Sequence, residues 1–121
     1  MNDCLFCKIV NNEIKSYTVY EDNTFKVILD VNPISNGHML IIPKKHILNC
    51  QDIDDETFSK MNNIIKNMHL LLENKLHING LKLVQNNGIA QEVKHYHVHL
   101  TPIYNEKQNK ENIEIIYNKL K

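Results

Sequence analysis

The sequence predicts an α+β fold in which one long helix packs on a face of an antiparallel sheet of about five strands. Three observations lead to this prediction. Short stretches rich in β-branched and aromatic residues alternate with turn residues. One long segment carries apolar residues at helical spacing. No internal repeat or linker divides the 121 residues, which is a suitable length for a single domain over 1–121.

The first half of the chain contains three predicted strands. Residues 17–22 and 24–31 form two β-rich runs around an Asp-Asn turn, which is typical of a hairpin. Residues 38–43 follow as a short apolar run that Pro43 ends, which indicates a buried strand.

Residues 52–80 carry the strongest helix signal. Asp52, Asp54 and Asp55 are N-cap candidates, and acidic residues in a first turn interact favourably with the helix dipole. Gly80 is expected to end the helix. The apolar stripe consists of Phe58, Met61, Ile64, Ile65, Met68, Leu71 and Leu72.

Two further strands are predicted at residues 81–86 and 93–101, followed by a C-terminal tail over 104–121. The tail begins with an Asn- and Lys-rich stretch over 104–112. Its last residues, 110–121, are compatible with a short helix.

The charge balance argues against a general nucleic-acid binder or a membrane-surface protein. The formal net charge is zero, and all 14 basic residues are lysines. Without arginine, any phosphate must be held by His, Lys, Asn or backbone N–H groups. No apolar run reaches the length of a signal peptide or a transmembrane helix, and the three cysteines are an odd number. A cytoplasmic location is therefore expected.

Three histidines occupy alternate positions in the sequence KHYHVHLT: His95, His97 and His99. In an extended strand these side chains share one face, while Tyr96, Val98 and Leu100 point into the core. Three interpretations follow, namely a metal site, a catalytic site, or a polar strand face that is rich in histidine.

Cys4 and Cys7 form a Cys-x2-Cys pair, which is half of a tetrahedral zinc site. The other ligands must come from distant histidines. A loop after the third strand could bring His46 to the pair, whereas His69 and His77 fit a helix surface. The triplet is spaced unfavourably for one ion, because its outer members lie roughly 13 Å apart at Cα in a strand.

Taken together, these residues resemble the histidine triad family over nearly the whole chain. The resemblance is carried by CLFCKIVNNEI, by VYEDNTFKVILDVNPISNGHMLIIPKKH and by NNGIAQEVKHYHVHL, with its alternating histidines after a Gly-containing loop and a Gln. It implies a nucleotidyl hydrolase or transferase that acts on nucleoside phosphoramidates, dinucleoside polyphosphates and related conjugates. It also implies purine nucleotides as ligands and a homodimer.

The resemblance assigns a role to each histidine. His97 is implied as the nucleophile that attacks the α-phosphorus, held in the attacking tautomer with help from the carbonyl of His95. His99 and His38 are implied to contact the phosphate and stabilise developing charge. Structural zinc is implied at Cys4, Cys7, His46 and His95, which divides the triplet between metal and substrate.

The resemblance also implies a nucleoside site. Asp30 matches the acid that binds the ribose hydroxyls, and Asn86 matches the amide near the scissile bond. Gln91 precedes the triplet at the family spacing. The apolar contacts to the base are implied at Ile14, Ile28 and Val31, which are equally suited to a core.

Three positions depart from the family pattern. The loop over 86–91 is two residues shorter than usual, which is expected to move backbone donors near the phosphate. Glu92 stands where Ser or Thr is common, and a carboxylate there would repel phosphate unless it is protonated or turned away. Ile103 stands where Arg is frequent. Glu92 and the short loop favour an alternative function, a nucleotide-binding regulatory protein with little turnover.

A zinc hydrolase that uses the triplet directly is the third hypothesis. The set Cys4, Cys7 and His46 argues against it, because that set offers zinc a better site.

Overall fold

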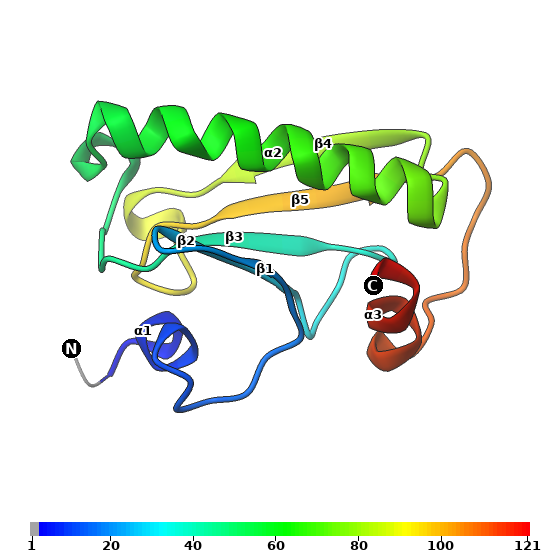
Figure 1. The fold of residues 1–121 in the computed structure, drawn as a ribbon, viewed down its shortest axis with the longest axis horizontal. Coiled ribbons are helices and arrows are strands. Elements are labelled where there is room, and N and C mark those ends of the chain that lie inside the picture. The colour runs from blue at the N-terminus through cyan, green and yellow to red at the C-terminus, as the bar shows by residue number, and fades with distance from the viewer. Residues whose placement is uncertain (1–2) are drawn as a thin grey trace.

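The structure is a computed structural model that describes residues 3–121, and it contains one five-stranded antiparallel sheet in the order β1-β2-β3-β5-β4 (Figure 1). This confirms the predicted fold class. The strands are β1 (Thr18–Glu21), β2 (Phe25–Leu29), β3 (Met39–Pro43), β4 (Gly80–Gln85) and β5 (Val98–Ile103). The α-helices are α1 (Leu5–Val10), α2 (Asp55–Leu76) and α3 (Ile113–Leu120), and 3₁₀ turns occupy Cys50–Asp52 and Gly88–Ala90.

The two central strands β2 and β3 are buried along their whole length because both faces of the sheet are covered. On one face, Phe25, Val27, Met39 and Ile41 pack with buried residues of α2 and α3. On the other face, Ile28, Leu40 and Ile42 pack with Phe6 and Ile9 of α1. Figure 1 shows α2 running along one side of the sheet and α1 on the opposite side.

The N-terminus of α2 is as predicted, but its C-terminus differs. The side chain of Asp54 caps the helix by accepting the N–H of Thr57, and this satisfies one of the free donors of the first turn. Gly80 does not end the helix; it begins β4. The helix ends instead at His77, which adopts the left-handed conformation with φ 55° and hydrogen-bonds to the carbonyl of Glu73.

The buried face of α2 is narrower than the predicted stripe. Met61, Ile64, Met68 and Leu72 are buried, whereas Phe58 is exposed near the start of the helix. The short C-terminal helix is present as α3, and its Ile116 and Leu120 join the main core. Across residues 3–121, no helix has the length and apolar character needed to cross a bilayer.

Lys26 joins α1 to the sheet. Although it lies on buried β2, its Nζ donates to the carbonyl of Ile9 at 3.0 Å and to the side chain of Asn12 at 2.8 Å. A buried ammonium needs such acceptors, since an unpaired charge in the interior is costly. This contact fixes the N-terminal helix, and with it Cys4 and Cys7, against the strands.

Candidate functional site

The histidine triplet does not lie wholly within a strand. β5 begins only at Val98, so His95 and His97 stand in an irregular segment before it. The predicted alternation nevertheless holds for the core, because Tyr96, Val98 and Leu100 are all buried. The N–H of Tyr96 bonds to the carbonyl of Ile47. The segment is thus tied to the residues after β3 rather than to a neighbouring strand.

Four side chains gather where α1 begins: Cys4, Cys7, His46 and His95. The Nδ1 of His95 lies 3.3 Å from the sulfur of Cys4 and 3.6 Å from that of Cys7, and the Nδ1 of His46 lies 3.2 Å from the sulfur of Cys7. In a tetrahedral zinc site, sulfur and nitrogen ligands are separated by about 3.5 Å. The four ligand atoms therefore fit around one zinc ion.

The lone pair of His95 is directed at the sulfurs by a backbone group. Its Nε2 lies 2.8 Å from the carbonyl of Pro43, and a carbonyl only accepts, so Nε2 carries the ring proton. Nδ1 is then unprotonated, as a metal ligand must be. Burial raises the pKa of Cys7 to about 11, with the neighbouring Cys4 adding to the shift. Cys7 is therefore a thiol unless a cation stabilises the thiolate.

His97 has the opposite tautomer. Its Nδ1 lies 2.8 Å from the carbonyl of His95, so Nδ1 carries the proton and Nε2 has a free lone pair. Burial lowers the pKa of His97 below 6.5, which keeps the ring neutral at pH 7. The ring of Phe6 packs edge-on against it at 4.8 Å between centroids. His97 is thus a buried, neutral imidazole with a fixed orientation.

His38 and His99 form a second cluster with Asp30. The N–H of Ile34 donates to Nδ1 of His38 at 3.0 Å, so the proton of the neutral His38 ring is on Nε2. That Nε2 donates to Nδ1 of His99 at 2.9 Å, which places the proton of His99 on its own Nε2. Burial lowers the pKa of His38, against the attraction of Asp30, which lies 3.6 Å away.

This second cluster has the residue types of a metal site but not the free lone pairs. Asp30, His38 and His99 are close enough to surround one ion. However, Nδ1 of His38 already accepts a hydrogen bond from Ile34. The nitrogen of His38 that faces the cluster, Nε2, therefore carries the proton and has no lone pair for a metal. The hydrogen-bonded pair therefore leaves one ring donor, the Nε2–H of His99, that can reach an anion.

The residues implied for the nucleoside are divided between surface and core. Ile14 and Val31 are exposed, as base contacts must be, whereas Ile28 is 4% exposed and belongs to the core. Asp30 is partly exposed, and one of its oxygens accepts the N–H of Asn32 at 2.8 Å. Asn86 is partly exposed at the end of β4. Ile28 packs in the core beneath α1 and is not available for direct contact with a ligand.

The short loop over 86–91 is anchored to the segment before α2. Asn87 accepts the N–H of Cys50 at 2.7 Å, and Asn49 accepts the N–H of Gly88 at 2.9 Å. Gln91 is buried, and its amide donates to the carbonyl of Leu48. Gln91 therefore acts within the fold to hold the loop in place.

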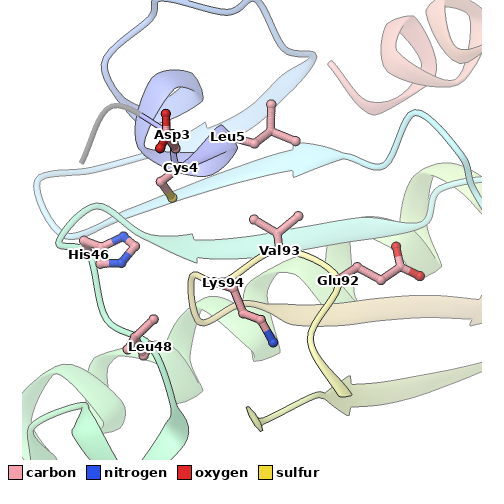
Figure 2. A pocket seen from close by; sticks show the side chains of 8 residues that line it. All are labelled: Asp3, Cys4, Leu5, His46, Leu48, Glu92, Val93 and Lys94. Atoms are coloured by element: carbon pink, nitrogen blue, oxygen red, sulfur yellow. The ribbon is translucent and has the colours of Figure 1, made fainter. Parts of the chain in front are cut away.

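An open cleft of about 830 Å³ lies beside the cysteine–histidine set. Figure 2 shows Cys4 and His46 on one side of it and Glu92 on the other, with the carboxylate of Glu92 pointing away from them. Glu92 is exposed, and its charge acts to raise the pKa of His97. Ile103 stands at the far end of β5, where its side chain lies against Gly80.

Sequence reasoning missed two groups that set the chemistry of the histidines: the carbonyl of Pro43 and the N–H of Ile34. Both are backbone groups. Every residue carries a C=O and every residue except proline carries an N–H, so the residue type does not mark either group. Phe6 was also missed as a contact of His97. Its place between the two cysteines of the Cys-x2-Cys pair was the available signal.

A family model described as HIT domain matches residues 11–106. An adenosine 5'-monophosphoramidase from Saccharomyces cerevisiae is 41% identical over 106 residues, which cover 86% of this chain and 65% of that protein. A solved hypothetical histidine triad nucleotide-binding protein from Sulfolobus tokodaii superimposes with a TM-score of 0.89 at 34% identity, covering 97% of this chain and 89% of that one.

A second solved structure bears on the cysteine–histidine set. It is a zinc-bound histidine triad family protein from Mycobacterium smegmatis, with a TM-score of 0.89 at 31% identity, and the match covers 98% of this chain and 91% of that one.

Proposed function

The chain belongs to the HIT, or histidine triad, family, and on this premise we propose that it cleaves nucleotide conjugates at the α-phosphate through a nucleotidyl-histidine intermediate. The proposed substrates are nucleoside phosphoramidates or dinucleoside polyphosphates, with a purine nucleoside. The monophosphoramidase activity named for the yeast relative supports the first class.

The observation that carries this proposal is the orientation of His97. Its Nε2 lone pair is free because Nδ1 is bound to the carbonyl of His95, and its lowered pKa keeps that lone pair available at pH 7. A neutral, buried imidazole with a fixed tautomer needs no further activation to attack phosphorus.

The proposed reaction has two steps. In the first, Nε2 of His97 forms a bond to the α-phosphorus, and the bond from phosphorus to the leaving group breaks. The leaving group departs with its electron pair and, where it is an amine, takes a proton from solvent. In the second step, water attacks the phosphorus and releases a proton to solvent, the bond to His97 breaks and a nucleoside monophosphate is released. Both steps place extra negative charge on the phosphate oxygens.

His38 and His99 would stabilise that charge. In the hydrogen-bonded pair, His38 donates to His99, which leaves the Nε2–H of His99 for a phosphate oxygen. Asp30 would bind the ribose hydroxyls through its second oxygen, with Asn86 close to the scissile bond. Ile14 and Val31 would contact the base from the surface, above the buried Ile28.

We further propose a structural zinc ion held by Cys4, Cys7, His46 and His95. Four protein ligands complete a tetrahedron and leave no open position for a water molecule, so such an ion supplies stability and not a nucleophile. It would join the start of α1 to the segment that carries His97. The zinc-bound relative from Mycobacterium smegmatis supports this assignment.

A homodimer in a reducing compartment such as the cytoplasm completes the proposal. The edge strand β4 exposes Leu83 and Val84, which suits pairing with a second copy. The described cysteines are unpaired, which agrees with a reducing environment.

A second candidate function is nucleotide binding with little turnover. The exposed carboxylate of Glu92, in the segment that leads to His97, favours it, because a negative charge there opposes the approach of phosphate.

One experiment separates the two functions. The protein is incubated with a panel of nucleoside phosphoramidates and dinucleoside polyphosphates, product is quantified, and nucleotidylated protein is trapped by acid quench and detected by intact mass. The enzyme hypothesis predicts multiple turnovers and an adduct that is absent from His97→Ala. Binding of a mononucleotide without product or adduct would leave the binding protein as the function.

A further inference from the structure

The loop between β2 and β3 carries Asp30 and His38 on its inner side, and its outer side is held by the C-terminal part of the chain. We define residues 104–112 as the strap; it leads from the end of β5 to α3. Glu111 of the strap and Ile113 and Ile116 beyond it line the same small hollow as Asp30 and His38. A segment with the composition of a solvated tail therefore lies against the candidate site.

Asn36 is the centre of this contact. It is only 5% exposed, and its side chain spans two backbone groups of the strap. Its amide nitrogen donates to the carbonyl of Asn109 at 2.9 Å, and its amide oxygen accepts the N–H of Glu111 at 2.9 Å. Its own carbonyl accepts from the hydroxyl of Tyr104 at 2.7 Å. Three hydrogen bonds thus converge on this one buried residue.

Neighbouring residues fix the loop from other directions. Ser35 donates from its hydroxyl to the carbonyl of Pro102 at 2.6 Å. Gly37 has φ +91°, and a Cβ added there would lie 2.6 Å from Leu76 of α2. The loop is therefore packed against α2 on one side and bound to the strap on the other. It cannot move on either side without losing these contacts.

The position of this loop determines the proton on His38. Ile34 lies two residues before Asn36, and its N–H occupies Nδ1 of His38. If the loop shifts, that donor leaves, and the neutral ring is free to place its proton on either nitrogen. The proton that His38 donates to His99 is then no longer fixed.

We propose that the strap, acting through Asn36, is a positioning element that sets the tautomer of His38 and thereby directs the proton of His99 into the site. Asn36 is a positioning residue because it touches the strap and not the substrate. The catalytic consequence rests on the function proposed above, whereas the tautomer does not.

The test uses the full-length protein and two variants. Asn36→Ala removes both side-chain bonds to the strap, and Tyr104→Phe removes only the hydroxyl that bonds to the carbonyl of Asn36. Lys110→Ala is the matched control, since Lys110 is exposed within the strap and Asn36 binds the backbone of its two neighbours. The ring nitrogens of ¹⁵N-labelled histidines are recorded by NMR, and turnover of a nucleoside phosphoramidate is measured.

The expected result is a change confined to His38 and His99. In Asn36→Ala the spectrum of His38 changes from a single tautomer to a mixture, and Tyr104→Phe gives a smaller change in the same direction. His97 keeps its Nδ1 proton in every variant, because the carbonyl of His95 does not touch the strap. Turnover falls by roughly 10- to 100-fold in Asn36→Ala, the range expected for misplacing a catalytic group. Lys110→Ala matches the native protein in both measurements.

Two results would overturn the proposal. If folded Asn36→Ala keeps the native spectrum of His38, the strap does not set the tautomer. If Asn36→Ala does not fold, Tyr104→Phe decides in the same way. If the tautomer changes while turnover is unaffected, the positioning role in catalysis is wrong. A native protein that shows no turnover contradicts the proposed function, and the spectra still decide whether the strap sets the tautomer.

Discussion

The two histidine clusters of this protein differ in which backbone group binds each ring. At the cluster of Cys4, Cys7, His46 and His95, the carbonyl of Pro43 accepts a hydrogen bond from Nε2–H of His95, so the lone pair on Nδ1 faces the sulfurs. At the cluster of Asp30, His38 and His99, the N–H of Ile34 occupies the lone pair of His38, so a proton faces inward. The same kind of side chain therefore presents a lone pair to its neighbours in one place and an N–H donor in the other.

His97 stands between the two clusters. Its Nδ1 donates a hydrogen bond to the carbonyl of His95, which joins His97 directly to a member of the cysteine–histidine set. The proposed function gives the histidine-rich segment three separate tasks, and substitutions should separate them.

The largest expected effect is on turnover in His97→Ala. Removal of the nucleophile should lower the rate on a phosphoramidate on the order of 10⁴-fold, as for other covalent catalysts. Affinity for a mononucleotide should change little. His69→Ala, on the partly exposed surface of α2, is the control and should retain full activity. A near-native rate in His97→Ala would exclude the covalent mechanism.

Cys4→Ser should affect the cluster of Cys4, Cys7, His46 and His95, and its main effect should be on the stability of the fold. The variant should hold less than one zinc per chain, and the free energy of unfolding should fall by about 4 kcal/mol or more, the range in which loss of a metal site falls. Metal analysis and denaturant unfolding test this. Cys50→Ser, a cysteine outside the metal set, should keep both properties. Equal zinc content in the two variants would remove Cys4 from the ligand set.

Acidification should weaken the donor cluster. Burial lowers the pKa of His38 below its ordinary value of 6.5, so the folded chain binds fewer protons there than the unfolded chain. The stability contributed by neutral His38 is therefore present above pH 6.5 and is lost as the pH falls toward the folded value. Asp30, His99 and Glu111 face this ring, and Asp30 moderates the shift.

Denaturant unfolding between pH 7.5 and pH 5 measures this effect. His38→Gln, which cannot titrate, should show a shallower decline than the native protein. Identical declines in the two proteins would show that His38 contributes nothing to the pH dependence.

The smallest expected effect is that of Glu92→Ser. Removal of an exposed charge in the segment before His97 should raise kcat/KM for a phosphoramidate by about 1.4- to fivefold, in line with interactions of about 0.2–1 kcal/mol between exposed charges. Glu106→Ser, at an exposed position in the strap, is the control and should leave the rate unchanged. A lower kcat/KM in Glu92→Ser would show that the carboxylate assists the reaction.

The sequence predicts the frame of the molecule well because periodicity reports burial. The helix α2 and all five strands follow from it, whereas the cap at Asp54 is one of three candidates that residue type alone left open. The predicted end of α2 at Gly80 was wrong because His77 adopts the left-handed conformation that a glycine was expected to supply. The predicted start of the last strand at residue 93 was also wrong. The N–H of Tyr96 bonds to the carbonyl of Ile47 instead of to a neighbouring strand.

The candidate site could be predicted only as a set of side chains. Resemblance implies the four proposed ligands, and the structure brings Cys4, Cys7, His46 and His95 together. What each imidazole can do depends on backbone atoms of Pro43, Ile34 and His95, and these positions exist only once the chain is folded. The role of Asn36 was hidden for the same reason, because its partners are backbone groups more than 70 residues away.

The most direct test of the division between the clusters is removal of the metal from folded protein at low temperature, with turnover and circular dichroism followed together. If zinc is structural and His97 is the nucleophile, turnover should persist after the metal is lost and decline only as the chain unfolds. If turnover stops at once while the fold persists, and added zinc restores it, the metal performs the chemistry and the role given to His97 is wrong.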